Sequence, residues 1–455
     1  MESIRALKND LSRAFEKISS MEKYSYRYWR VRILYSSIIG YAAFYLVRQN
    51  FSMAMPKLSE EFGYTKTDLG WMITCASIIY GVGKFINGYL SDRSDARYFM
   101  TIGLLGSAIV SCFIGLTSGV IMLGILWIVN NWFQSMGWPP AARMLTHWFS
   151  PKEIGTKWAL WASAHQIGAT IVSVGAPYLI FHFGWRAAFF VPAMVTFFIA
   201  ILCFNRLRDT PKEVGLPPVE EYKNDVIAAA QEDQERITVK DVINLVFTNK
   251  LVWYVGMANL CLYIPRMGVM TWAPTFLKEH KGVTLILAGW QLASFEIAGL
   301  LGGILAGWLS DKVCGGRRGP VGTIYLALLA GAMFMLKATP QGYAWFDTIT
   351  LFLSGFLVYG PQVLVGIAAT DFASKKAAGV ATGFTGTLAY AGAAITGVPL
   401  GMIVDHFGWD GGFVLFIGAS LLGAFFFALT WRHRATILEK KPVRVVNVKE
   451  SEPTA

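Results

Sequence analysis

The most regular feature of the chain is a series of apolar runs, each about 20 residues long, that recur between residues 33 and 431. Each run is long enough to cross the hydrocarbon core of a bilayer as a helix. Gly or Pro interrupts several of them, which membrane helices tolerate where neighbours satisfy the freed backbone groups. The pattern predicts twelve spans, at about 33–55, 69–90, 98–117, 120–147, 157–182, 186–205, 251–277, 284–309, 321–338, 345–371, 377–404 and 411–431.

Short segments recur in the same order in the two parts of the chain, at offsets between 218 and 224 residues. The pairs are Tyr45-Leu-Val-Arg48 with Tyr263-Ile-Pro-Arg266, Gly88-Tyr-Leu-Ser-Asp92-Arg93 with Gly307-Trp-Leu-Ser-Asp311-Lys312, and Phe183-Gly-Trp185 with Phe407-Gly-Trp409. Three matches at nearly one offset indicate a duplication. We therefore predict an all-α membrane protein built from two six-helix repeats. In transporters with this design the substrate site lies near the midplane between the repeats.

The polar stretches divide the chain further. The predicted parts are an arm at 1–32, a first half at 33–205, a linker at 206–250, a second half at 251–431 and a tail at 432–455. Apolar residues of the arm follow helical spacing, which fits an amphipathic helix on the membrane surface. A disordered or partner-binding arm remains an alternative.

The positive charge of the chain is distributed unevenly. The net charge is +11, which by itself could suggest a nucleic-acid partner. However, 31 of the 40 Lys and Arg residues fall on one side of the predicted membrane and only 6 on the other. By the positive-inside rule both termini are expected in the cytoplasm, and we expect a bacterial inner membrane rather than a nucleic-acid partner.

The composition excludes several function classes. Hydrophobic residues make up 54% of the chain and charged residues 15%, which excludes a soluble enzyme. No GxSxG, HExxH or GxxxxGK[ST] motif is present, and we expect neither enzyme activity nor a cofactor. None of the five cysteines has CxxC spacing, so we expect unpaired thiols and no metal site.

Two arginines lie inside predicted spans at equivalent positions of the repeats, Arg48 and Arg266. An arginine in the bilayer is costly and calls for a partner. Two guanidiniums supply donor forks and a charge of +2, which suit a phosphate monoester of about −1.5 to −2. The alternative is that each pairs with a buried acid or caps broken helix backbone. We predict that they bind phosphate or a phosphate ester.

Two further charges lie in spans. Lys84 is the remaining buried base and Glu296 the clearest buried acid. They are expected either to pair with each other or to face the site. For Glu296 a structural or gating role is favoured over proton transfer.

Polar and aromatic side chains accompany these charges. Tyr41, Tyr45 and Arg48 share a helix face, and similar spacing joins Tyr80 to Lys84 and Tyr263 to Arg266. Tyrosine can donate to a phosphate oxygen while it packs against apolar neighbours. Other candidates are His165, which could bind phosphate or exchange a proton, and Gln134 and Trp138 at a helix break. Ordinary packing and kink formation are the alternatives for each.

Twelve spans, two halves and a doubled Gly-x-x-x-Asp-Arg/Lys loop resemble the major facilitator superfamily. The resemblance implies that Asp92, Arg93, Asp311 and Lys312 form cytoplasmic latches that change with the access state. Helix capping by the aspartates is the alternative. The fold of this superfamily needs only one chain, so a monomer is expected.

A finer resemblance is to the organophosphate:phosphate antiporters. It rests on Tyr45-Leu-Val-Arg48-Gln-Asn-Phe, Met136-Gly-Trp-Pro-Pro140, Arg266-Met-Gly-Val-Met-Thr-Trp-Ala-Pro-Thr275 and Lys375-Lys-Ala-Ala-Gly379. It implies that Arg48 and Arg266 hold phosphate, and it adds Tyr359 and Tyr390 to the cavity. It also implies exchange of an external phosphate ester for internal inorganic phosphate.

The organic part of the substrate is less constrained. Glycerol-3-phosphate members of that family tend to have Lys after the essential Arg, whereas this chain has Gln49. Span eleven looks closer to the glucose-6-phosphate transporter and sensor branch, which favours hexose 6-phosphate. Glycerol 3-phosphate exchange, a sugar-phosphate sensor with a signalling partner, and a proton-coupled symporter remain alternatives.

Overall fold

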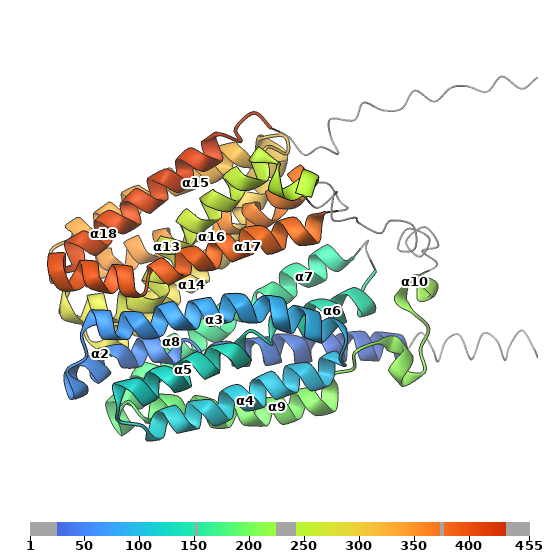
Figure 1. Ribbon diagram of the computed structural model, residues 1–455, viewed down its shortest axis with the longest axis horizontal. Helices are drawn as coiled ribbons and strands as arrows, with labels where there is room; N and C mark the ends of the chain where they lie inside the picture. The colour runs from blue at the N-terminus through green and yellow to red at the C-terminus, as the bar shows by residue number, and fades with distance from the viewer. Residues whose placement is uncertain (1–24, 151–152, 224–242, 374–376, 434–455) are drawn as a thin grey trace, which may run out of the picture.

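The computed structural model describes residues 25–150, 153–223, 243–373 and 377–433. Most of the arm and tail, the middle of the linker and the Lys375 segment lie outside these described residues. The described chain forms two helical bundles that lie side by side (Figure 1). Residues 25–206 build the first bundle and residues 250–433 the second.

The first described helix covers residues 25–46 and is followed by a turn. The remaining helices of the first bundle are α2 (Asn50–Phe62), α3 (Lys66–Asp92), α4 (Ala96–Leu116), α5 (Val120–Gln134), α6 (Trp138–Trp148), α7 (Ile154–Ala162), α8 (Ala164–Phe183) and α9 (Ala187–Arg206). Short helical turns follow at Pro211–Val214, α10 (Val219–Tyr222) and Ile243–Phe247. The second bundle contains α13 (Lys250–Glu279), α14 (Leu285–Trp308), a turn at Leu309–Val313, α15 (Arg318–Ala338), α16 (Ala344–Ala373), α17 (Ala378–Ile395) and α18 (Val398–Ala428).

Several helix starts follow from local capping chemistry. Thr65 accepts a hydrogen bond from Asp68 N, and the Asp68 carboxylate accepts from Thr65 N, so that α3 begins with a capping box. Asp95 caps α4 by accepting from Arg97 N at 2.8 Å. Each of the two N-cap residues, Thr65 and Asp95, lies three or four residues before the next apolar run, which is why the sequence locates these helix starts within a few residues.

Nine helical segments of the described chain are long and apolar enough to cross a membrane. The segment Gly379–Ala428 contains two of the predicted spans, because the chain bends at Gly408, where φ is 67°. Two further crossings are residues 25–62 and α13, which carry the intramembrane arginines. The predicted twelve-helix architecture is therefore confirmed.

Close backbone contacts join the two bundles. α3 packs on α17 and α18, and α8 packs on α14. A Cβ on Gly70 would lie 2.7 Å from the Gly397 carbonyl oxygen, and one on Gly289 would lie 2.2 Å from the Ser173 carbonyl oxygen. Both contacts therefore require glycine, since helices approach closely only where the side chain is minimal.

Polar contacts between the bundles are concentrated at the end opposite residues 25 and 433, which we call the distal end. Asp405 of the second bundle caps α3 of the first by accepting from the backbone N–H groups of Lys66 and Thr67 at 3.1 and 2.8 Å. Lys66 also pairs with Glu279 at 2.7 Å. Lys278 and Glu60 form a second ion pair there. The distal end is thus closed by contacts between the bundles.

The opposite end, which we call the terminal end, has a different pattern. Its ion pairs among the described residues include Arg30 with Glu153, Arg143 with Asp209, and Arg318 with both Asp311 and Asp371. None of these pairs joins the two bundles. Among the described residues, the ion pairs between the bundles therefore lie at the distal end.

Candidate substrate site

Helix breaks and prolines position the two intramembrane arginines. Arg48 lies in the turn between the first helix and α2, where the N–H groups of Arg48 and Gln49 donate to Tyr45 O at 3.3 and 3.0 Å. Arg266 follows Pro265 in the middle of α13 and is 5% exposed. Within the described chain, no carboxylate forms an ion pair with either guanidinium.

One series of aromatic contacts leads from Arg48 to Arg266. The Cζ atom of Arg48 lies 4.3 Å from the ring centroid of Tyr80, which stacks on Tyr390 at 4.8 Å. Tyr390 contacts Tyr263 at 5.9 Å, and Tyr263 lies 5.0 Å from the Cζ atom of Arg266. These distances suit cation–π and ring–ring contacts. The series crosses from one bundle to the other between Tyr80 and Tyr390.

A second series returns from Arg266 to Arg48. The Cζ atom of Arg266 lies 5.0 Å from the Tyr359 ring, and Tyr359 contacts His165 at 5.7 Å. His165 contacts Tyr45 at 5.8 Å, and Tyr45 lies 5.6 Å from the Cζ atom of Arg48. The two series form a closed loop between the bundles. We call these eight side chains the contact ring: Arg48, Tyr80, Tyr390, Tyr263, Arg266, Tyr359, His165 and Tyr45.

Lys84 adds a third cation beside the contact ring. Its Nζ atom lies 5.3 Å from the Tyr390 ring and 5.7 Å from the Trp138 ring. Trp138 contacts Tyr41 at 6.0 Å, and Tyr41 contacts Tyr45 at 5.8 Å. Like the two arginines, Lys84 forms no ion pair within the described residues.

Glu296 reaches the contact ring through a tyrosine. It is 1% exposed, and its Oε2 accepts a hydrogen bond from the Tyr359 hydroxyl at 2.7 Å. Of the two expected arrangements, an ion pair between Glu296 and Lys84 is not formed in this structure. Glu296 instead places its carboxyl group behind Tyr359, whose ring Arg266 faces.

Several polar atoms at the contact ring are buried without a hydrogen-bond partner in the described part of the chain. They are Nε2 of His165, Nε of Arg266 and Oε1 of Glu296. Nδ1 of His165 donates to Ala162 O at 2.5 Å, so in the neutral ring Nε2 is an acceptor. Buried polar atoms are usually hydrogen-bonded, so these three atoms are available to a polar ligand or to water.

Gln134 lies apart from the contact ring. Its Nε2 donates to the Ser107 hydroxyl at 3.3 Å, and its Oε1 is buried with no partner among the described residues. The structure therefore brings together the other eleven candidate binding residues and leaves Gln134 in contact with α4.

One residue of the site region was not among the predicted candidates. Gln49 is 7% exposed, and its side-chain amide donates to the Met270 carbonyl across the bundle interface and to the Ser52 hydroxyl at 3.0 Å. The Tyr359 hydroxyl also lies 3.9 Å from the Met270 sulfur. The sequence draws attention to Gln49 only because related glycerol-3-phosphate transporters tend to have Lys at this position. It does not indicate which residue of another helix the amide will contact.

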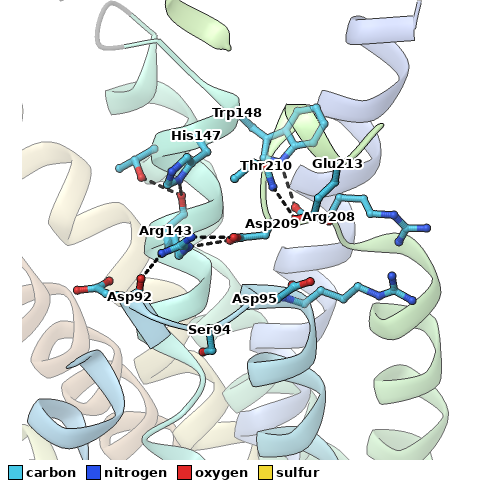
Figure 2. Close-up of polar contacts among 12 residues, drawn as sticks. Asp92, Ser94, Asp95, Arg143, His147, Trp148, Arg208, Asp209, Thr210 and Glu213 are labelled. Carbon is cyan, nitrogen blue, oxygen red and sulfur yellow. Dashed lines mark hydrogen bonds and ion pairs between the residues drawn. The ribbon is translucent and has the colours of Figure 1, made fainter. Parts of the chain in front are cut away.

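The first expected latch is organised around a different residue. The guanidinium of Arg143 binds the Asp209 carboxylate through two hydrogen bonds of 2.8 Å and donates to the Asp92 carbonyl at 2.5 Å (Figure 2). Asp92 and Arg93 are both exposed, and Arg93 lies 3.6 Å over the Tyr89 ring. Arg143 therefore links the end of α3 to the segment that follows α9.

The residues of the second expected latch have a comparable arrangement. Arg318 binds the carboxylates of both Asp311 and Asp371, and Lys312 is exposed. An arginine bridge thus recurs in both bundles. The sequence motif identified the aspartates but not the bridging arginines, because their partners come from other helices.

Comparison with known proteins identifies the family of this architecture. Residues 37–397 match the family model described as Major Facilitator Superfamily, and these residues include both arginines of the contact ring. The chain belongs to the Major Facilitator Superfamily. It is accordingly a multi-pass membrane protein of a transporter family.

Relatives within the superfamily extend over nearly the whole chain. A probable hexose phosphate transport protein of Chlamydia pneumoniae is 39% identical, with 90% of this chain and 92% of that protein covered. A glycerol-3-phosphate transporter of Bacillus subtilis is 42% identical, with 90% and 93% covered. The membrane sensor protein UhpC of Escherichia coli is 37% identical, with 88% and 91% covered.

Solved structures of transporters share the fold. A bacterial homologue of the human lysosomal transporter Spinster, in an inward-facing and occupied conformation, superposes with a TM-score of 0.72. The match covers 88% of this chain and 97% of that one at 13% identity. At this identity the likeness establishes the arrangement of the helices alone.

Proposed function

We propose that this protein exchanges an external hexose 6-phosphate for internal inorganic phosphate by alternating access. The observation that carries the proposal is the contact ring, which brings together Arg48 and Arg266 from the two bundles. Neither arginine forms an ion pair with a carboxylate of the described residues. Lys84 adds a third positive charge, and Glu296 offsets one. The resulting charge of about +2 matches a phosphate monoester near neutral pH.

The chemistry of the ring suits the two parts of such a substrate. Guanidinium forks bind phosphate oxygens in pairs, and tyrosine hydroxyls donate further hydrogen bonds. Nε2 of His165 is an acceptor for a sugar hydroxyl when the ring is neutral. The relatives named as hexose phosphate and glycerol-3-phosphate transporters support a phosphate ester, and Gln49 favours the hexose.

The exchange follows from the charges. We take residues 33–205 and 251–431 as the two halves that rock around the site. An empty site leaves the three cations facing one another across the interface in a medium of low dielectric, so closure around it is disfavoured. Bound phosphate removes this repulsion, which allows the halves to move only when loaded. The distal contacts favour access from the terminal end in the present state.

The distribution of basic residues sets the orientation of the protein in the membrane. We place both termini in the cytoplasm of a cell with an inner membrane, because basic residues are concentrated at the terminal end. One chain supplies every residue of the contact ring, which supports a monomer.

The test is exchange in proteoliposomes loaded with inorganic phosphate, with labelled glucose 6-phosphate or glycerol 3-phosphate outside. We expect uptake of glucose 6-phosphate that needs internal phosphate and is lost in Arg48→Lys. Preferred uptake of glycerol 3-phosphate would reassign the ester. Comparable efflux into buffer that lacks phosphate would refute obligatory exchange, and uptake driven by a pH gradient without internal phosphate would indicate a proton symporter.

A sensor is the second candidate, favoured by the similarity to UhpC. It would bind the sugar phosphate at the contact ring and act on a signalling partner instead of moving the ligand. Saturable binding of glucose 6-phosphate by the purified protein, with no uptake in the same proteoliposomes, would establish it.

A further inference from the structure

A cluster of arginines at the terminal end lies outside the contact ring and its latches. Arg32 donates to Asn205 O at 2.7 Å and to Arg206 O at 3.2 Å, and Arg208 donates to Asn205 O at 3.2 Å. Both guanidiniums also lie against the same indole, with Cζ atoms 4.5 and 5.4 Å from the ring centroid of Trp29. Two cations therefore converge where α9 ends.

A third cation, Arg97 of α4, joins this group. Its Cζ atom lies 4.2 Å from the ring of Phe204, the residue before Asn205, and its Nε atom is buried with no hydrogen-bond partner in the described chain. Burial lowers the pKa of Arg208, and the neighbouring charges of Arg97 and Arg32 lower it further. The three like charges therefore raise one another's free energy.

The nearby acids offset the charge of the cluster only in part, because Glu213 and Asp95 act to raise the pKa of Arg208 while its net shift is downward. Asp95 accepts from Arg97 N at 2.8 Å, and Glu213 accepts from Thr210 N at 3.3 Å, so both carboxylates are engaged in capping helical turns. Among the described ion pairs, neither acid is joined to Arg32, Arg97 or Arg208. In Figure 2 the Arg208 side chain extends away from the Arg143–Asp209 pair. The C-terminal carbonyls of α9 carry only about half a negative charge.

The surroundings are those of a membrane interface. Tyr28, Tyr98 and Phe204 are 54%, 49% and 38% exposed beside the arginines. Exposed apolar residues continue from there toward the bilayer core, among them Ile102 on α4 and Phe198 on α9. Aromatic side chains of this kind lie at the level of lipid headgroups, where guanidiniums meet phosphates.

We propose that Arg32, Arg97 and Arg208 form a binding site for the phosphate of an anionic phospholipid in the leaflet at the terminal end. The guanidiniums bind the phosphodiester, and Trp29 and Phe204 pack against the glycerol and upper acyl carbons. The bound lipid then stands between three cations that otherwise repel one another, and it ties the first helix and α4 to the end of α9.

Native mass spectrometry of the purified full chain tests this with an equimolar mixture of phosphatidylglycerol and phosphatidylcholine. We expect preferential binding of phosphatidylglycerol, reduced about fivefold for each charge removed in Arg97→Gln and in the double variant with Arg208→Gln. Arg432→Gln is the matched control, because Arg432 is an exposed arginine of the other bundle. An equal reduction in the control, or no lipid preference in the wild type, overturns the proposal.

Two further measurements separate a bound lipid from free phosphate and from unselective membrane contact. Inorganic phosphate at millimolar concentration should leave the lipid bound, whereas displacement would assign the site to free phosphate and overturn the lipid proposal. The emission of Trp29 is obtained by subtracting the tryptophan fluorescence of Trp29→Phe from that of the wild type. Brominated phosphatidylglycerol should quench this emission more strongly than brominated phosphatidylcholine does. This readout needs no arginine variant, and equal quenching by the two lipids would also overturn the proposal.

Discussion

The two bundles bring different charges to the same site. The first bundle contributes Arg48 and Lys84, neither of which has an acidic partner among the described residues. The second contributes Arg266 together with Glu296, which is hydrogen-bonded to the Tyr359 that Arg266 faces. The two repeats thus carry equivalent arginines, but the first bundle adds a second cation and the second bundle adds an acid. If the proposed function holds, we expect the first bundle to be the main anchor of the phosphate.

Replacing the arginines should give the largest effect. In Arg48→Lys a point charge replaces the planar guanidinium. The loss of charge-assisted hydrogen bonds should lower kcat/KM for phosphate exchange by about 100-fold. Arg266→Lys should cost less, about tenfold, since Glu296 already offsets its charge. Initial rates of phosphate exchange in proteoliposomes measure both. Equal losses would remove the proposed asymmetry.

Lys84→Gln should have the next largest effect. Removal of one of the two cations of the first bundle should raise the KM for phosphate about tenfold, with a smaller change in maximal rate. Lys337→Gln is a suitable control, because Lys337 pairs with Asp410 away from the site. An unchanged KM would show that Lys84 packs on Trp138 and Tyr390 without contacting the substrate.

Glu296→Gln should act in the opposite direction. It leaves the second bundle fully positive, so phosphate should bind about fivefold more tightly while turnover slows, because the substrate leaves less readily. Tyr359→Phe keeps the carboxyl group of Glu296 and removes its hydrogen bond. This variant therefore distinguishes the effect of the charge of Glu296 from the effect of its hydrogen bond. A weaker affinity in Glu296→Gln would contradict the assignment of the acid as a counter-charge.

Gln49→Leu should give the smallest effect of the four. It removes a hydrogen bond between the bundles, which contributes about 1 kcal/mol, and should shift the balance of access states a few-fold toward distal opening. Labelling of a cysteine placed at the distal end, with and without phosphate, measures the shift. Ser52→Ala, which removes only the neighbour within the same helix, should leave labelling unchanged.

The sequence predicted the helices and all eight members of the contact ring, although Tyr359 and Tyr390 came only from the family resemblance. A bilayer imposes a fixed helix length and makes a charge in the middle of an apolar run conspicuous, whereas the buried pair of Lys281 and Asp347 near helix ends was not predicted. Spacing placed Tyr45 with Arg48, and the structure keeps them in contact. Contacts between helices could not be predicted in the same way. One example is the hydrogen bond of Tyr359 to Glu296, which depends on how α14 packs on α16 within the second bundle. Another is the hydrogen bond of Gln49 to Met270, which depends on how the two bundles meet.

The contacts at the distal end have a consequence for the environment in which the protein works. Lys66, Glu279, Lys278 and Glu60 are reached by solvent, with side chains between 17% and 50% exposed. Dissolved ions screen such pairs over a Debye length of about 8 Å at physiological ionic strength. The salinity of the medium on that side therefore influences how stable the closed distal end is. The arginines of the contact ring are buried and remain shielded from it.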